Sequence, residues 1–361
     1  MGKIRVVIVD DSSMARGLLR AFLEDEPDIE IVGEASNGRQ AVELTRTLRP
    51  DLVTMDLEMP VMSGLDAIDE IMHSKGVPIL VVSSVADAHN AMEAMGRGAL
   101  EVVNKPDYTP AQAAEFVAKV RMLAGVLVIT RMRVRKAVVL PGQVSPLVLP
   151  AAAVAALPLR STPCDAPYAR VFAIACSTGG PQALAQILSA LPADFSCPVL
   201  IAQHISDGFA GGMAEWLAGL CALPVLLAAE GDCLQAGVVY VSPSERHLCV
   251  LPNRRLGLIE RGPLDVYRPS CNVLLNSVAE VFGRQAIGII LSGMGSDGAQ
   301  GMARIRNKGG MTLGQDEKSS VIYGMNRVAI EAGDVNRVMA VEAMAQAMVQ
   351  LANPHLQGVG A

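Results

Sequence analysis

Residues 4–11 read IRVVIVDD, an apolar run that stops at two aspartates. The same arrangement recurs twice, because Asp56 follows LVTM at 52–55 and Lys105 follows EVVN at 101–104. Short runs rich in valine, isoleucine and leucine predict buried β-strands. In a doubly wound parallel sheet the carboxyl ends of the strands meet at one edge. We therefore expect these charged residues, far apart in the sequence, to line one pocket.

The chemistry of these strand-end residues points to phosphate and a hard cation. Three clustered carboxylates, Asp10, Asp11 and Asp56, form the all-oxygen ligand set that Mg²⁺ prefers. Lys105 supplies a compact positive charge for a phosphoryl group. A carboxylate held beside a metal is also a possible nucleophile toward phosphate. The alternative is that these are solvated acids at strand ends and an ordinary surface lysine.

Strand-like and helical patterns alternate over the whole first third of the chain. Further strands are expected at 28–35 and 77–83, and amphipathic helices at 13–26, 63–75 and 111–125. Such alternation predicts βα units and a parallel sheet. We therefore predict a doubly wound α/β domain over residues 1–132, with a flavodoxin-like topology.

The chain then changes character before the alternation resumes. Residues 133–168 are rich in proline and alanine and show no clear period, which predicts a linker. Residues 169–353 again alternate strands and helices, which predicts a second doubly wound α/β domain of Rossmann type, followed by a tail at 354–361. An antiparallel hairpin is expected within GVVYVSPSERHLCVL, residues 237–251.

Three residues of the second domain each follow a predicted strand. Ser177 comes after VFAIAC and opens a turn into a helix, His204 comes after PVLIAQ, and Asp297 lies in the loop after AIGIIL. At one sheet edge they can converge as a serine hydrolase triad, which is recognised by geometry rather than chain order. Singly, each has a plainer interpretation: a helix N-cap, a surface histidine and a turn acid. Their joint position favours the triad.

Two other residues compete for these roles. Cys176 could be the nucleophile, but side chains alternate along a strand, so it should point away from Ser177. His247 could be the base, yet it lies at the start of a strand within the expected hairpin. Both alternatives are weaker than the pairing of Ser177 with His204.

A dinucleotide-binding function is the main rival. Gly293, Gly295 and Gly298 form G-x-G-x-x-G between a strand and a helix, and Asp316 follows where a ribose-binding acid is expected. This motif comes late in the domain and explains neither Ser177 nor His204. A further alternative is a phosphorylation-controlled binding module with an inactive hydrolase domain.

Composition limits the remaining possibilities. With 361 residues, 51% of them hydrophobic, the chain can bury two cores, and its net charge of −6 does not favour nucleic acid as a partner. Seven cysteines without a C-x-x-C pair predict free thiols and a cytoplasmic location. The most apolar stretch, residues 147–159, carries two prolines and is shorter than the roughly 20 residues that span a bilayer. We expect no membrane insertion.

The N-terminal domain resembles the response-regulator receiver domains of two-component signalling. The matching residues are Asp10-Asp11, Asp56 followed by Met59-Pro60 and Gly64, Ser83, and Lys105-Pro106. The resemblance implies that Asp56 accepts phosphate from a histidine kinase. It also implies that Asp11, Asp56 and the backbone carbonyl of Glu58 hold Mg²⁺, supported by Asp10 through water.

The resemblance also assigns the phosphate-sensing residues. Ser83 would donate a hydrogen bond to the phosphoryl oxygen, and Lys105 would pair with it. The family usually has an aromatic switch residue where this chain has Val102, which puts the usual aromatic swing in doubt.

Residues 170 to about 350 resemble the catalytic domain of the chemotaxis protein-glutamate methylesterases. The matches are Ser177-Thr178-Gly179-Gly180-Pro181, Gln203-His204, Arg268-Pro269-Ser270, Gly293-Met294-Gly295 with Asp297-Gly298, Gln315-Asp316 with Ser319-Ser320, and Tyr323-Gly324-Met325. The resemblance implies that Ser177 is the nucleophile, His204 the general base and acid, and Asp297 its orienting partner. Thr178 and Gly179 would form the active-site loop, and the Met294 amide would help to bind the oxyanion.

What the resemblance implies for function is specific. The substrates would be methylated chemoreceptor cytoplasmic domains, whose glutamate methyl esters are hydrolysed to glutamate and methanol, with glutamine deamidation as a possible second activity. The esterase chemistry itself would need no cofactor. Cys271-Asn272 stands where Val-Asp is usual, Ala175 where glycine is usual and Asn326 where proline is usual, so we expect an altered loop near the cleft.

Overall fold

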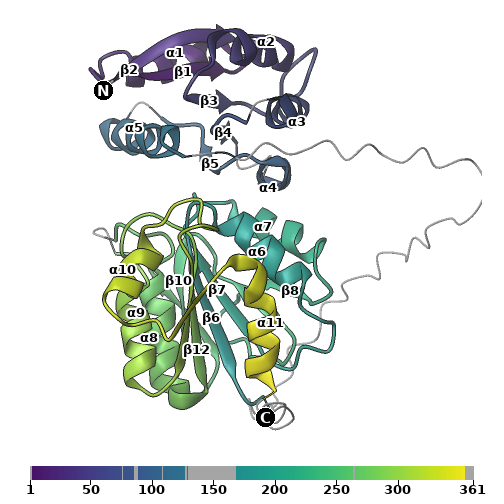
Figure 1. Ribbon diagram of the computed structural model, residues 1–361, viewed down its shortest axis with the longest axis vertical. Coiled ribbons are helices and arrows are strands. Elements are labelled where there is room, and N and C mark those ends of the chain that lie inside the picture. Colours follow the sequence, from purple (N-terminus) through teal and green to yellow (C-terminus); the bar gives the residue numbers. More distant parts are fainter. Residues whose placement is uncertain are drawn as a thin grey trace, which may run out of the picture.

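The computed structural model describes residues 2–74, 76–84, 88–107, 109–126, 128, 168–262 and 265–353, and these form two α/β domains (Figure 1). The predicted tail at 354–361 and the predicted linker at 133–168 lie outside the described residues, apart from Tyr168. That residue is buried and packs against Phe282, with ring centroids 6.2 Å apart. The packing therefore joins Tyr168 to the core of the second domain.

The N-terminal domain contains one five-stranded sheet in the order β2-β1-β3-β4-β5, with every neighbouring pair parallel. The strands are β1 (Ile4–Val9), β2 (Ile29–Ala35), β3 (Leu52–Met55), β4 (Ile79–Ser83) and β5 (Glu101–Asn104). The helices are α1 (Ser13–Leu23), α2 (Gly38–Leu48), α3 (Gly64–Ser74), α4 (Ala88–Arg97) and α5 (Pro110–Ala124). This strand order confirms the predicted flavodoxin-like topology.

Local capping determines where several of these helices begin. The side chains of Ser12, Asn37 and Thr109 each accept a backbone N–H three residues ahead, at 3.3, 3.0 and 3.4 Å. A cap of this kind stabilises a helix by about 1 kcal/mol. Helix α3 begins very close to the backbone at the end of β3, because a Cβ on Gly64 would lie 2.1 Å from the backbone oxygen of Asp56. Only glycine allows the helix to begin so near the end of β3.

The C-terminal domain is built on a seven-stranded parallel sheet in the order β14-β13-β12-β6-β7-β9-β8. Its strands are β6 (Val171–Cys176), β7 (Val199–Gln203), β8 (Val225–Leu227), β9 (Val239–Val241), β12 (Ala286–Ile290), β13 (Met311–Gln315) and β14 (Arg337–Met339). The helices are α6 (Gly180–Ser189), α7 (Ala210–Ala218), α8 (Cys271–Phe282), α9 (Ala299–Asn307), α10 (Met325–Glu331) and α11 (Val341–Ala352), with a short 3₁₀ turn at Gly283–Gln285.

The position of β6 in this sheet decides where a ligand can bind. The next strand in the chain, β7, lies on one side of it, and β12 lies on the other. The strand order therefore reverses at β6. In open α/β sheets such a reversal leaves a crevice at the carboxyl ends of the strands. The loops after β6, β7 and β12 meet there.

An antiparallel hairpin exists, but it lies later in the chain than predicted, and only its first strand falls within residues 237–251. Residues 239–241 join the main sheet as β9, parallel to β7 and β8. The antiparallel pair is formed instead by β10 (Arg246–Val250) and β11 (Leu256–Glu260). The prediction failed because 239–241 and 248–250 are both short apolar runs, and only tertiary pairing separates a core strand from a hairpin strand.

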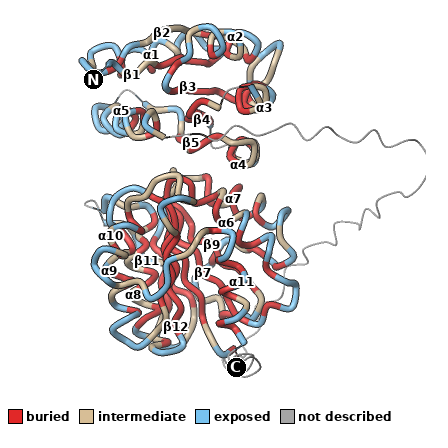
Figure 2. The backbone as a smooth tube through the Cα atoms, in the orientation of Figure 1, coloured by how far each residue is buried: buried red, intermediate tan, exposed pale blue. Residues whose placement is uncertain are grey.

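The N-terminal domain packs with α4 and β5 toward the C-terminal domain (Figure 1). Helix α4 lies against α7, since a Cβ on Gly96 would be 3.2 Å from the Trp216 ring and one on Gly212 would be 2.8 Å from the backbone of Ala88. Buried apolar residues of both domains form one continuous cluster. Figure 2 shows the buried residues concentrated along the strands and the exposed ones along the outer helices.

Two predictions from the sequence concern membrane insertion and the state of the cysteines. Within the described ranges, no helix has both the length and the apolar character needed to cross a bilayer. Among the described residues, Cys176, Cys197, Cys221, Cys249 and Cys271 are free thiols, as expected, whereas Cys233 is disulfide-bonded, which corrects the expectation for that residue.

Candidate active site

Ser177 occupies a tight turn between β6 and α6. Its backbone N–H donates to the Ser292 carbonyl at 3.0 Å, and its own carbonyl accepts from Gly180 N at 2.7 Å and from Gln203 Nε2 at 2.9 Å. A Cβ on Gly180 would lie 2.0 Å from Gln203 Oε1, so the turn closes around that amide only with glycine. Gly179 has φ +82°, which also favours glycine. The turn therefore fixes the Ser177 backbone.

His204 follows β7 at the same sheet edge. Its backbone N–H donates to the carbonyl of Cys176, and its ring stacks on Tyr267 with centroids 5.1 Å apart and an interplanar angle of 17°. Nε2 lies 2.8 Å from Asp297 Oδ2. That bond places the proton on Nε2, which leaves the Nδ1 lone pair able to accept a proton.

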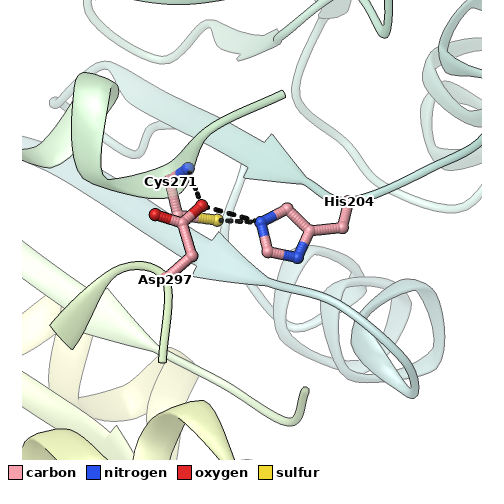
Figure 3. A group of neighbouring side chains, drawn as sticks. All are labelled: His204, Cys271 and Asp297. Carbon is pink, nitrogen blue, oxygen red and sulfur yellow. Dashed lines mark hydrogen bonds and ion pairs between the residues drawn. The ribbon is translucent and has the colours of Figure 1, made fainter. Parts of the chain in front are cut away.

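The carboxylate of Asp297 is held by the N-terminus of α8 (Figure 3). Oδ2 accepts from Cys271 N at 2.6 Å, and Oδ1 accepts from Asn272 N at 3.0 Å and from Ser270 Oγ at 3.2 Å. Burial alone raises the pKa of Asp297, but the bond from His204 and these amide donors outweigh it, so the pKa lies below the usual value. Asp297 is therefore an anion that keeps His204 in a single orientation.

Asn272 caps a helix in a way that the sequence did not predict. Its Oδ1 accepts from Gly298 N at 3.1 Å and from Gly301 N at 2.8 Å, so it caps α9 while Asp297 caps α8. An amide oxygen accepts these bonds as a carboxylate oxygen would. Asn272 therefore connects the loop before α9 to α8, and the altered loop expected from the replacement of the usual acid stays a prediction.

The two rival residues are engaged elsewhere. Cys176 is fully buried, and burial raises its pKa far above that of a reactive thiol. His247 is also buried, where its Nε2 contacts Asp265 Oδ2 at 2.9 Å and its Nδ1 accepts from Ser270 N at 2.9 Å. Neither arrangement places a nucleophile or a base in the crevice.

Two backbone N–H donors belong to loops that line one cavity with Ser177. Within the described residues, the N–H groups of Thr178 and Met294 donate no hydrogen bond to the protein. The two residues lie on the loops after β6 and β12 and line one cavity with Ser177. Preorganised N–H groups at such a position stabilise a developing oxyanion.

The glycines of the rival dinucleotide motif have local packing reasons. A Cβ on Gly293 would lie 2.6 Å from the Cβ of Ser177, and Gly298 has φ +94° before α9. Asp316 accepts from the backbone N–H of Ser319 at 2.9 Å and so closes its own turn. These glycines thus allow the loop to pack against the serine turn, and none of these contacts requires a pyrophosphate.

A second site lies at the carboxyl edge of the N-terminal sheet. Asp10 and Asp56 are buried, and Lys105 Nζ lies 2.9 Å from Asp10 Oδ2 and 3.2 Å from Asp56 Oδ2. Burial raises the pKa of Asp56 to about 6, the charge of Asp10 adds to the rise, and Lys105 partly offsets it. The structure thus brings the predicted strand-end residues together.

This pocket fits a hard cation and a phosphoryl group. Asp10, Asp11 and Asp56 each offer a carboxylate oxygen, and these oxygens lie within 4.8 Å of one another. The Ser83 hydroxyl is fully buried and has no hydrogen-bond partner among the described residues. Glu58 follows in the loop after β3, next to the acid cluster in sequence, and its side chain is exposed. The donor set matches that expected for Mg²⁺.

Hydrogen bonds and a shared cavity connect the two domains beside the Ser177 turn. Glu101 of β5 accepts from Thr178 Oγ1 at 2.5 Å and pairs with Lys119, while Gln182 Nε2 donates to the Ala99 carbonyl at 2.6 Å. A cavity of about 660 Å³ lies beside these contacts and is lined by both domains. The N-terminal domain therefore touches the residue next to Ser177.

Sequence reasoning missed three residues at this site: Glu101, Tyr267 and Asn272 in its capping position. Tyr267 immediately precedes the Arg268-Pro269-Ser270 motif, so its proximity to the cleft could have been noticed. Glu101 bonds to a residue 77 positions away, and no local pattern marks it.

Comparisons with known proteins identify the family to which each domain belongs. The family model described as CheB methylesterase matches residues 172–348, and that of the response regulator receiver domain matches residues 6–118. A protein-glutamate methylesterase/protein-glutamine glutaminase of Paramagnetospirillum magneticum is 55% identical over 97% of this chain and 96% of its own length. Another, from Anaeromyxobacter dehalogenans, is 39% identical over 96% of this chain and 97% of its own length.

One solved structure covers the second domain. The crystal structure of the Thermotoga maritima CheB methylesterase catalytic domain shares 30% identity, covers 50% of this chain and 98% of that chain, and has a TM-score of 0.49. The family models and the full-length relatives together cover both domains in order. The chain therefore belongs to the CheB methylesterase family, with a response regulator receiver domain ahead of its catalytic domain.

Proposed function

We propose that this chain hydrolyses the methyl esters of glutamate side chains on chemoreceptors and that phosphorylation of its receiver domain controls the reaction. Ser177 is the nucleophile, His204 the general base and acid, and Asp297 the residue that orients the imidazole. The observation that carries this proposal is the His204–Asp297 bond of 2.8 Å, formed beside the serine turn at the point where the strand order reverses. The names of the full-length relatives support the substrate class.

The reaction has two halves. Ser177 Oγ attacks the ester carbonyl as His204 takes the hydroxyl proton, and the amides of Thr178 and Met294 hold the resulting oxyanion. The protonated imidazole then gives its proton to the methoxy oxygen, so that methanol leaves and an acyl-serine remains. Water attacks this acyl group with His204 again as base, which releases glutamate and restores the Ser177 hydroxyl. No step needs a cofactor.

The receiver supplies the control. The Asp56 carboxylate accepts a phosphoryl group from a histidine kinase, while Asp10, Asp11, Asp56 and the Glu58 carbonyl would hold Mg²⁺. The bound ion would neutralise charge on the phosphoryl oxygens. Ser83 and Lys105 would contact those oxygens, and the Ser83 hydroxyl supports this assignment because it has no hydrogen-bond partner among the residues that the structure describes.

Phosphorylation would act through the interface beside the active site. The receiver in this state contacts Thr178 through Glu101 and borders the cavity that holds Ser177. Movement of Ser83 and Lys105 toward phosphate would shift β4 and β5, and β5 carries Glu101. We expect this shift to loosen the contact and open the cavity to a receptor segment. Val102, on the same strand, lacks the aromatic ring that usually assists such a shift.

The remaining parts of the proposal concern partners and location. The substrates are methylated cytoplasmic domains of chemoreceptors, the phosphodonor is a histidine kinase, and the protein acts in the cytoplasm. Receptor glutamine deamidation, named for the relatives, would follow the same acyl-serine route with ammonia as the leaving group.

One assay tests the central proposal. Receptor membranes carrying labelled methyl groups are incubated with the protein, and methanol release is measured with and without Mg²⁺ and a small phosphodonor. We expect basal release, stimulation by the phosphodonor, and a loss of about 10⁴-fold or more in Ser177→Ala. A folded Ser177→Ala protein that keeps more than a tenth of the activity contradicts the assignment.

A second measurement addresses the dinucleotide alternative. Calorimetry with NAD and NADP at millimolar concentration should show no binding, because the glycines of the loop after β12 pack against the serine turn. Saturable binding that Asp316→Ala abolishes would favour the alternative.

A further inference from the structure

A thiol lies beside the His204–Asp297 pair (Figure 3). Cys271 Sγ is 3.4 Å from His204 Nε2, the same nitrogen that contacts Asp297 Oδ2 at 2.8 Å. One donor atom from each of these three residues lies within 4.8 Å of the others. An imidazole nitrogen, a sulfur and a carboxylate oxygen therefore converge from three separate segments of the chain.

This combination of donors matches a particular class of metal. Zn²⁺ takes histidine nitrogen, cysteine sulfur and carboxylate oxygen, and three protein ligands leave a fourth position for water. We propose that His204, Cys271 and Asp297 form a binding site for Zn²⁺, and that its occupation switches the hydrolase off. The inhibitory half rests on the proposed function, whereas the binding half does not.

The spacing of the ligand atoms is close to what zinc requires. Tetrahedral bonds of about 2.0 Å to nitrogen and oxygen and about 2.3 Å to sulfur separate nitrogen from sulfur by about 3.5 Å and nitrogen from oxygen by about 3.3 Å. The observed separations are 3.4 and 2.8 Å. The His204–Asp297 pair has to open by about 0.5 Å, and the Cys271 sulfur lies within 4.8 Å of the Asp297 oxygen.

Charge and surroundings also favour the site. A thiolate and a carboxylate neutralise the two positive charges of Zn²⁺, so the buried complex carries no net charge. Asp297 keeps its bonds from Asn272 N and Ser270 Oγ, and His204 stays stacked on Tyr267. Such secondary contacts hold metal ligands in orientation. His204 lines the 660 Å³ cavity, which gives an entry path.

Binding would remove the catalytic base. The Cys271 thiol proton leaves for solvent, and the proton on His204 Nε2 moves to Nδ1 as Nε2 takes the metal. The ring then has no lone pair for the Ser177 proton, and Asp297 binds the metal instead of the imidazole. Both steps are proton transfers, so no oxidant or reductant is required.

The receiver pocket would not compete for this ion when magnesium is present. Asp10, Asp11 and Asp56 offer only oxygen, which suits Mg²⁺, whereas sulfur favours zinc. The two clusters therefore separate hard from soft cations within one chain.

The binding test uses the full chain in millimolar magnesium. Zinc is titrated calorimetrically into wild type, Cys271→Val and Cys221→Ser. Cys221 is a partly buried free thiol that follows α7 in the chain, and it controls for general thiol binding. We expect one zinc per chain for wild type and Cys221→Ser, and a loss of at least about 100-fold in affinity for Cys271→Val. Equal affinity in Cys271→Val overturns the site.

A spectroscopic measurement avoids dependence on one variant. Cobalt(II) bound in place of zinc should give a thiolate-to-metal charge-transfer band in wild type and in Ser177→Ala. If Cys271→Val does not fold, Cys271→Ala takes its place, and the band should vanish in either variant. A wild-type complex without the band means that Cys271 is a packing thiol only, and the inference fails.

Activity separates this inference from the proposed function. Zinc should inhibit methanol release by wild type, and a chelator should restore it. The rate of Cys271→Val with zinc should stay close to the rate of the same variant without zinc. A protein that shows the cobalt band but never releases methanol contradicts the proposed function and leaves the metal site standing. An active esterase without the band contradicts only the metal site.

Discussion

Asp56 and Asp297 occupy equivalent places in the two domains, yet their pKa values shift in opposite directions. Both are buried carboxylates beyond the carboxyl ends of parallel strands. The pKa of Asp56 rises to about 6, because burial and the nearby Asp10 outweigh Lys105. The pKa of Asp297 falls, because His204 and amide donors outweigh burial. Neighbouring groups, not position in the fold, decide the charge state.

The comparison explains why the same sheet edge supports different chemistry. The Asp56 pocket has more negative charge than its one lysine balances, so it gains from a cation and a reactive phosphoryl group. The Asp297 site is satisfied by the protein itself, with three donors besides His204. One carboxylate is poised to react, and the other is fixed as a permanent anion.

The largest expected effect comes from neutralising each aspartate in turn. Asp297→Asn should lower the rate of methanol release by about 10⁴-fold, because an amide does not hold the imidazole in the required tautomer. Asp56→Asn should leave the basal rate unchanged, since it lies in the receiver. Methanol release and circular dichroism are measured together. Comparable losses in both variants, with both folded, would remove the distinction between the two aspartates.

A second effect concerns stability and pH. The folded pKa of Asp56, about 6, exceeds the ordinary aspartate pKa of 3.8, so the folded chain binds more protons than the unfolded chain between about pH 4 and 6. Stability therefore falls as pH rises through this window. Without divalent ions at pH 8, Asp56→Asn should be more stable than wild type by up to about 3 kcal/mol.

Denaturant unfolding checks this prediction. The gain should shrink as pH falls through this window and disappear below about pH 3, where Asp56 is protonated in both states, and it should also shrink when Mg²⁺ is added. The exposed Asp25 gives a matched control, and Asp25→Asn should change little. An Asp56→Asn variant less stable than wild type at pH 8 contradicts the picture of an electrostatically strained pocket. The contribution of Asp297 to stability has the opposite pH dependence, because it is lost as pH falls through the lowered pKa of that residue.

The third effect measures how strongly the sites are coupled. Asp56→Asn should lose stimulation by the phosphodonor, and deletion of residues 1–150 should raise the basal rate. Coupling free energies of this kind correspond to about 5- to 150-fold. Methanol release by both proteins is compared with that of the unphosphorylated full chain. A truncated enzyme no faster than the full chain would mean that the receiver activates directly or acts by localisation.

The sequence predicted what depends on strand ends and failed where distant segments meet. Asp10, Asp56, Lys105, Ser177 and His204 follow apolar runs, so their convergence follows from a parallel sheet. The position of the hairpin depended on which of two apolar runs would join the main sheet, and only tertiary pairing decides that. The capping oxygen of Asn272 and the interface role of Glu101 likewise depend on contacts between separate elements.

The smallest expected effect isolates the contact between the two regions. Glu101 is the residue through which the receiver touches Thr178, and Thr178 adjoins Ser177, the proposed nucleophile. One hydrogen bond contributes about 1 kcal/mol, so Glu101→Ala should raise the basal rate about fivefold by weakening the closed arrangement. Asp25→Ala removes the same charge from an exposed position and should leave the rate unaltered. Because Glu101 also pairs with Lys119, thermal unfolding must show that Glu101→Ala keeps its receiver folded. If that folded variant is no faster than wild type, the Glu101–Thr178 bond does not restrain the active site, and the packing of α4 on α7 must carry the restraint.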